Sequence, residues 1–169
     1  MLNYRELYDL IGDLTPLPAD CGEVCAAACC GGSEEEGMWL FPGEEVPGGS
    51  VTEQEGVRLF VCAGRCDRNA RPLACRLFPL LPYLTKEGRV RVIYDPRAFR
   101  LCPLVRLQTH LRLQPAFVRS VAAVGYALRR NPEGKAFLDT LSRQADGINR
   151  FLTLEEARSP ICRRKGVVK

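Results

Sequence analysis

Residues 21–30 read Cys21-Gly-Glu-Val-Cys25-Ala-Ala-Ala-Cys29-Cys30, a run that holds four cysteines in ten residues. Nine cysteines spread evenly over 169 residues would place only about 0.5 in a stretch of this length. In a reducing compartment such clustering is typical of metal binding or redox chemistry rather than of disulfides. The run therefore predicts a fold organised around metal-bound thiolates.

The spacing within this run limits how it can bind a metal. In a continuous helix, cysteines four residues apart lie about 6 Å apart along the axis, whereas the sulfurs around one tetrahedral zinc must lie within about 4 Å of each other. Two such cysteines can share an ion, but Cys21, Cys25 and Cys29 in one helix cannot. Either the backbone breaks within the run, or the run serves more than one metal. We favour the second alternative, with Cys29 and Cys30 in different centres.

Further cysteines downstream carry similar signals. Cys62 and Cys66 form a C-x3-C pair around a glycine, a spacing that zinc knuckles use. Cys75 lies in residues 71–79, Arg-Pro-Leu-Ala-Cys-Arg-Leu-Phe-Pro, where the prolines frame a single helical turn, and Cys102 precedes a proline. Arginines crowd this part of the chain, and a guanidinium near a thiolate lowers the pKa of the thiol and offsets the negative charge of an all-thiolate centre.

Together these motifs resemble the zinc- or iron-chelating cysteine-cluster family (YkgJ-like, CxxCxxCC type) over about residues 20–105. The similarity is sharpest over residues 71–79, and the first run departs from the family pattern because its gaps are three residues long instead of two. The resemblance implies eight metal-binding cysteines, which in this chain are Cys21, Cys25, Cys29, Cys30, Cys62, Cys66, Cys75 and Cys102.

Four other residues are weaker candidates. Cys162 lies outside the pattern in a basic stretch, and we interpret it as a bystander thiol. His110, the only histidine, has no cysteine or acidic residue near it in sequence and is interpreted as structural or solvent-facing. Glu44 and Glu45 are candidates for an oxygen ligand or a contact behind one, but a solvated turn is the favoured interpretation.

Composition and charge describe the rest of the chain. With 46% apolar and 26% charged residues, it is typical of a globular protein. Residues 1–96 hold 9 Lys/Arg and 15 Asp/Glu (net −6), and residues 97–169 hold 15 and 5 (net +10), which sum to the overall +4. A basic section attracts acidic partners, although arginines scattered over solvated helix faces are the plainer interpretation. No uncharged apolar run is long enough to cross a membrane, and the N-terminus shows no secretory signal, so we expect a cytoplasmic protein.

Apolar periodicity and turn residues predict an α+β fold. The expected elements are a helix over residues 3–14, strands at 38–41, 57–62 and 89–94, helices over 115–128 and 133–152, and a last short helix opened by a capping box of Thr153 and Glu156. We expect a loop-rich metal-binding module with short strands over residues 1–110, packed against a helical extension of the same domain over residues 111–169.

The chemistry of the ligands narrows the function. Cysteine-only coordination selects zinc or iron–sulfur, and we favour at least two zinc ions that hold the module together and contribute on the order of 10 kcal/mol per site. The expected function is a cytoplasmic metal-binding protein with a mainly structural or metal-chelating role and a protein partner on its basic helices. An iron–sulfur redox protein or accessory enzyme is the alternative, and a zinc-stabilised nucleic-acid-binding protein is a weaker one. The sequence assigns no catalytic residue.

Overall fold

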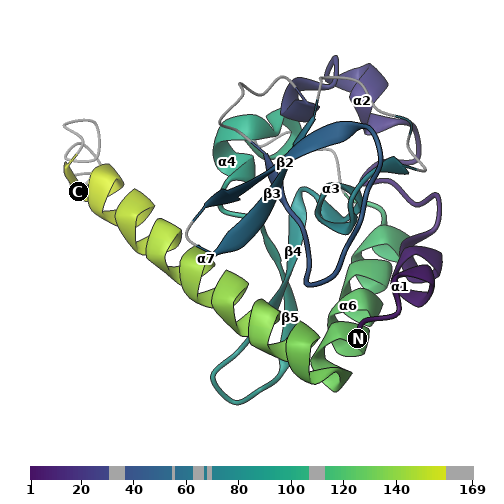
Figure 1. Ribbon diagram of the computed structural model, residues 1–169. Coiled ribbons are helices and arrows are strands. Elements are labelled where there is room, and N and C mark those ends of the chain that lie inside the picture. The colour runs from purple at the N-terminus through teal and green to yellow at the C-terminus, as the bar shows by residue number, and fades with distance from the viewer. Residues whose placement is uncertain (31–36, 55, 63–66, 68–69, 107–112, 159–169) are drawn as a thin grey trace, which may run out of the picture.

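The computed structural model of the chain describes residues 1–30, 37–54, 56–62, 67, 70–106 and 113–158, with the backbone alone described at 54, 62 and 153–158 (Figure 1). The helices are α1 (Tyr4–Ile11), α2 (Cys21–Val24), the 3₁₀ turn η1 (Ala28–Cys30), α3 (Leu73–Leu77), α4 (Ala98–Leu101), α5 (Pro103–Arg106), α6 (Pro115–Arg130) and α7 (Pro132–Arg158). The strands are β1 (Met38–Trp39), β2 (Gly49–Gln54), β3 (Val57–Cys62), β4 (Leu80–Leu84) and β5 (Val90–Tyr94).

Two small antiparallel sheets carry the strands. The first has the order β1-β3-β2, with Met38 opposite Phe60 and Gly49 opposite Cys62, and the second pairs β4 with β5. The strands predicted at 38–41, 57–62 and 89–94 are therefore present, although the first is only two residues long. Neither β2 nor β4 was expected. Between β2 and β3 the chain reverses at Gly56, whose φ of 76° suits a tight hairpin turn.

Helix α6 lies at the centre of the packing. Its predicted apolar stripe of Phe117, Val121, Val124 and Leu128 is completely buried, because residues spaced three and four apart share one helix face. The stripe joins one hydrophobic core with α1, α3, α7, β4 and β5. At Gly125 the helix approaches the second sheet so closely that an added Cβ would lie 2.7 Å from Val90 Cγ1 and 2.8 Å from Pro82 Cβ.

Helix α7 is longer than the sequence analysis predicts. It begins after Asn131, whose side-chain oxygen accepts hydrogen bonds from the backbone N–H of Glu133 (2.9 Å) and Gly134 (3.2 Å). It then continues without a break to Arg158, so the separate last helix beginning at Thr153 was a wrong prediction. No proline or other helix breaker separates the two predicted segments, and a continuous helix satisfies the backbone N–H groups that a new N-terminus would leave unpaired.

The fold is α+β, as predicted, with small antiparallel sheets packed against C-terminal helices. In Figure 1 the second half of α7 extends beyond the body formed by the sheets, α1 and α6, and Phe151 on this part is 60% exposed. Across the described ranges, no helix combines the length and the apolar character that a membrane span requires.

Candidate metal centre

The backbone breaks inside the first cysteine run. Helix α2 opens at Asp20, whose carboxylate accepts from the N–H of Gly22 (2.9 Å), and covers only Cys21–Val24. Ala26 and Ala27 then adopt φ values of 51° and 52°, in the left-handed region that residues other than glycine rarely occupy. The 3₁₀ turn η1 follows. Of the two alternatives in the sequence analysis, the broken backbone is the one observed, and the run therefore need not serve more than one metal.

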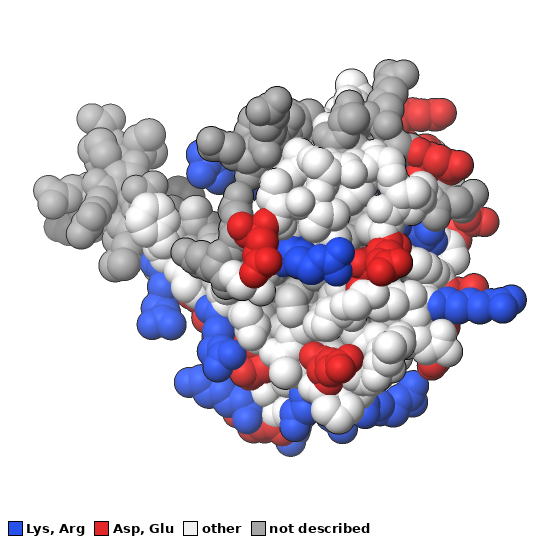
Figure 2. All heavy atoms as spheres, viewed as in Figure 1, with Lys and Arg blue, Asp and Glu red and all other residues white. Residues whose placement is uncertain are grey.

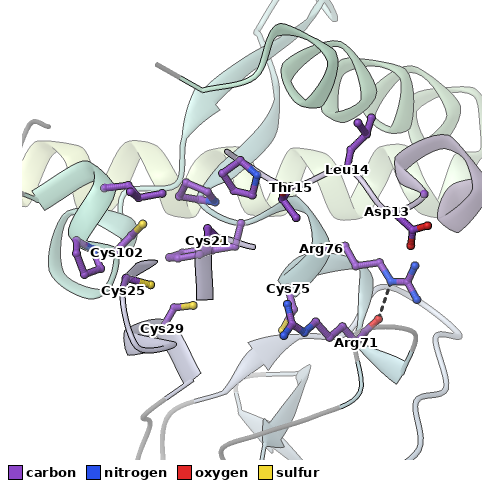
Figure 3. Close-up of a pocket in the computed structure, with 16 residues that line it drawn as sticks. Asp13, Leu14, Thr15, Cys21, Cys25, Cys29, Arg71, Cys75, Arg76 and Cys102 are labelled. Carbon is purple, nitrogen blue, oxygen red and sulfur yellow. Dashed lines mark hydrogen bonds between the residues drawn. The ribbon is translucent and has the colours of Figure 1, made fainter. Parts of the chain in front are cut away.

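Cysteines from distant parts of the chain line one pocket (Figure 3). They are Cys21, Cys25 and Cys29 from the first run, Cys75 from α3, and Cys102 from the end of α4. Cys25, Cys29 and Cys102 lie on one side of the pocket in Figure 3, and Cys75 lies across it beside Arg71. All five are thiols, not disulfides. The pocket is open to solvent, and its cavity volume is about 50 Å³.

Two arginines and the segment after α1 complete the pocket wall. Arg71 and Arg76, both in the predicted 71–79 motif, line it together with residues 12–16. Helix α1 ends at Gly12, whose φ of 50° turns the chain toward the pocket while its N–H donates to the carbonyl of Tyr8 (2.8 Å). Gln114, which does not line the pocket, stabilises this segment by donating a hydrogen bond to the carbonyl of Thr15 (3.1 Å). The position of residues 12–16 beside the cysteines could not be predicted, because no residue type among them indicates that they line a cysteine pocket.

The thiols of this pocket influence one another electrostatically. A hydrogen bond from Cys29 and the nearby Arg71 guanidinium lower the pKa of Cys30 to about 6. The same hydrogen bond, burial and repulsion by the charges of Cys21 and Cys25 raise the pKa of Cys29. Burial raises the pKa of Cys102. Thiolates close enough to shift one another's pKa repel each other unless a cation lies between them.

The donor set fits a thiophilic cation. Sulfur ligands select zinc, copper(I) or iron–sulfur clusters over magnesium or calcium. Among the residues that the structure describes, no three Cys, His, Asp or Glu side chains already converge on a single metal position. Binding therefore requires the thiol side chains to turn further into the pocket that they line.

The other predicted ligands lie outside the pocket lining or outside the described residues. Cys30 does not line the pocket but is hydrogen bonded to Cys29, which does. Cys62 ends β3, and its side chain is outside the described residues. Cys66, His110 and Cys162 also fall outside the described residues.

Glu44 corrects one prediction. Its neighbour Glu45 is exposed, but Glu44 is completely buried and does not form a solvated turn. Its carboxylate accepts hydrogen bonds from the Tyr8 hydroxyl (2.7 Å) and from the backbone N–H groups of Phe41 (3.0 Å) and Leu73 (2.6 Å). Burial raises the pKa of this carboxyl, and the three hydrogen bonds oppose that rise. The carboxylate is retained inside because it satisfies donors that would otherwise be buried without an acceptor.

Comparisons of the chain with models of protein families, with curated proteins and with solved structures found no match. The similarity of its motifs to the cysteine-cluster family therefore stays a prediction carried by the residues quoted above. What the pocket can do follows from its own geometry and donor chemistry.

Proposed function

We propose that this chain is a metal-binding protein in which cysteine thiolates hold zinc, with a structural or metal-chelating role. The observation that carries the proposal is the meeting of Cys75 and Cys102 with three cysteines of the first run around one pocket. Buried free thiols that merely fill space would not be expected to gather from three separate segments. Arg71 and Arg76 in the pocket wall supply positive charge that offsets an excess of thiolates.

The full proposal assigns two or more zinc ions to the eight cysteines of the predicted ligand set. Bound zinc would supply fixed coordination without redox chemistry. Cys21, Cys25, Cys29, Cys75 and Cys102 would contribute from the pocket, and Cys30, Cys62 and Cys66 would complete the set. The similarity to the cysteine-cluster family supports the same assignment.

An iron–sulfur protein is the second candidate, and the spread of the pocket cysteines along the sequence supports it. An iron–sulfur cluster tolerates cysteine ligands that are scattered along the sequence, as Cys29, Cys75 and Cys102 are. This candidate would make the chain a redox protein or accessory enzyme.

A protein partner on the basic helices, in the cytoplasm, completes the proposal. Figure 2 shows Lys and Arg along the lower and left edges of this face, interspersed with Asp and Glu, and a short row of acidic and basic side chains across its middle. On α6, the Arg129 guanidinium already has an internal acceptor, because it donates to the carbonyl of Gly88 (2.7 Å). A surface of mixed charge suits a protein partner. Nucleic acid instead requires a continuous basic groove.

Elemental analysis of protein purified without oxygen and without added metal tests the proposal. We expect a colourless protein that contains at least two zinc ions per chain. A brown protein with iron and acid-labile sulfide would establish the iron–sulfur candidate instead. Folded protein free of metal, or protein whose cysteines are joined in disulfides, would contradict both.

Replacing Cys75 by serine tests the ligand set. Cys75→Ser removes a thiolate and leaves a hydroxyl that binds zinc poorly, so we expect a lower zinc content and a lower melting temperature. Cys162→Ser is the matched control and should leave both unchanged. The role of Cys75 is refuted if its serine variant keeps the full zinc content and melting temperature.

A further inference from the structure

We propose that two buried carboxylates, Glu44 and Asp95, are positioning residues for the cysteine pocket, each holding the start of the short helix that presents one pocket cysteine. Glu44 is 0% exposed and Asp95 is 3% exposed, and they are the buried acidic residues of the described chain. Glu44 serves Cys75 on α3, and Asp95 serves Cys102 at the end of α4. The inference rests on the proposed metal-binding function.

Glu44 determines where α3 begins. Leu73 is the first residue of α3, and its N–H donates to the Glu44 carboxylate over 2.6 Å. The preceding Pro72 offers no side-chain cap, so the carboxylate takes the place of the missing capping group. Helix α3 has only five residues, too few to be stable without outside contacts. Cys75 lies two residues after Leu73, and its position therefore depends on this hydrogen bond.

The other end of α3 is held against the same tyrosine. Glu44 accepts from the Tyr8 hydroxyl (2.7 Å), and the Arg76 guanidinium lies 4.3 Å from the centre of the Tyr8 ring. Arg76 also donates from Nε to the carbonyl of Arg71 (3.0 Å). Cys75 thus lies between two attachments to α1. Glu44 therefore sets the position of Cys75 relative to α1 and to residues 12–16 of the pocket wall.

Asp95 plays the equivalent part for α4. Its carboxylate accepts from the backbone N–H of Arg97 (2.9 Å) and from the Arg97 guanidinium, and its carbonyl accepts from the N–H of Ala98 (2.8 Å), the first residue of α4. The N–H of Cys102 closes the helix by donating to the carbonyl of Ala98 (2.9 Å). One four-residue turn therefore connects Asp95 to the pocket cysteine.

A backbone hydrogen bond and a ring contact tie Asp95 to the rest of the pocket. Its N–H donates to the carbonyl of Pro79 (2.9 Å), a residue that lines the pocket just after α3. The Arg97 guanidinium bound to Asp95 lies 4.1 Å from the centre of the Trp39 ring in β1. Through these buried carboxylates, α3 is anchored to α1 by way of Glu44 and Tyr8, and α4 is anchored to β1 by way of Asp95, Arg97 and Trp39.

Cobalt(II) titration of the full chain tests this inference. Cobalt occupies zinc-type sites, and its absorption reports the number and geometry of thiolate ligands. Replacing either carboxylate by an amide turns one accepting oxygen into an NH₂ donor. This NH₂ group then faces an N–H or O–H donor and cannot form the original hydrogen bond. We therefore expect Glu44→Gln and Asp95→Asn to weaken cobalt binding by about 10- to 100-fold, the usual effect of residues behind a metal ligand, and to change the thiolate-to-cobalt band. The matched controls Glu45→Gln, at an exposed neighbour, and Asp146→Asn, which accepts from Tyr83 outside the pocket lining, should bind within twofold of the original chain.

Alkylation of the metal-free protein supplies a readout that a general loss of stability would not give. Peptide mass spectrometry after a pulse of iodoacetamide should show faster labelling of Cys75 in Glu44→Gln and of Cys102 in Asp95→Asn, with the other cysteine near its original rate. If either variant shows no cooperative melting, Glu44→Asp or Asp95→Glu takes its place, since each keeps the charge but moves the carboxylate by one methylene.

The outcomes separate the two proposals. An original chain that binds no cobalt overturns the proposed function, and the cysteine-selective alkylation then decides on the positioning role alone. Unchanged cobalt spectra and labelling rates in both variants overturn the positioning role. Equal acceleration at both cysteines in each variant overturns it as well, because that result shows a general loosening of the fold.

Discussion

Ala26 and Ala27 are the residues at which the first cysteine run changes direction. An alanine with φ near 51° is strained by about 1 kcal/mol because its Cβ crowds the backbone, whereas glycine adopts this conformation freely at the cost of about 0.5–1 kcal/mol of chain entropy. We expect Ala26→Gly to change the free energy of unfolding by less than about 0.5 kcal/mol. Ala28→Gly, in the 3₁₀ turn with negative φ, should lose about 0.5–1 kcal/mol. Urea denaturation of both variants measures the difference, and equal losses would show that the Ala26 conformation is unstrained.

Residue types predicted the cysteines that line the pocket but not the carboxylates that contact the short helices next to them. Cysteines can be picked out in a sequence by their chemistry and their clustering. Five of the eight predicted ligands line one pocket. Glu44 could not be separated from Glu45 in the same way, because its donors Tyr8 and Leu73 lie 36 and 29 positions away. Only the folded chain shows that one carboxylate of the pair is inside.

At the scale of elements, periodicity succeeded where packing is one-sided. The stripe of α6 follows from burying one face, and both α6 and β5 lie where they were predicted. In β5 only Val90 is fully buried, and Tyr94 on the same face is exposed. Strand β2 was missed because its residues are small and polar, typical of turns. It forms along its whole length by pairing with β3. Strand β4 was missed because Pro82 removes a backbone donor, and α7 was cut short because Thr153 resembles a helix start.

Two helical glycines give a matched test of element packing. An added Cβ at Gly125 of α6 would meet Val90 and Pro82 at less than 3 Å, whereas at Gly147 of α7 nothing lies within 4 Å. Gly147→Ala should therefore raise the free energy of unfolding by about 0.5–1 kcal/mol through helix propensity. Gly125→Ala should lower it by about 1–3 kcal/mol because the helix must move off the sheet. Thermal or urea unfolding measures both, and a stabilised Gly125→Ala would contradict the close approach of α6 to β4 and β5.

At the scale of the whole molecule, the hydrophobic core and the cysteine pocket are separate sources of order. The stripe of α6 is completely buried between α1, α7 and the second sheet, whereas α2 and η1 bury no residue at all. In Figure 1 α2 lies at one end of the body, near α3 and α4, and the turn between β4 and β5 lies at the other. The core excludes water without a metal, but the first cysteine run buries none of its residues, so a bound metal would be its main anchor.

Removal of metal should consequently loosen one end of the molecule and spare the other. We expect a chelator to increase amide hydrogen exchange strongly in residues 21–30 and moderately around Cys75 and Cys102, because their thiolates lose the cation that holds them together. Exchange in α6 should change little, because its amides open only with the core. Mass spectrometry of the exchanged protein, with and without chelator, gives the comparison. Loss of protection throughout α6 would show instead that metal binding and formation of the hydrophobic core are one cooperative event.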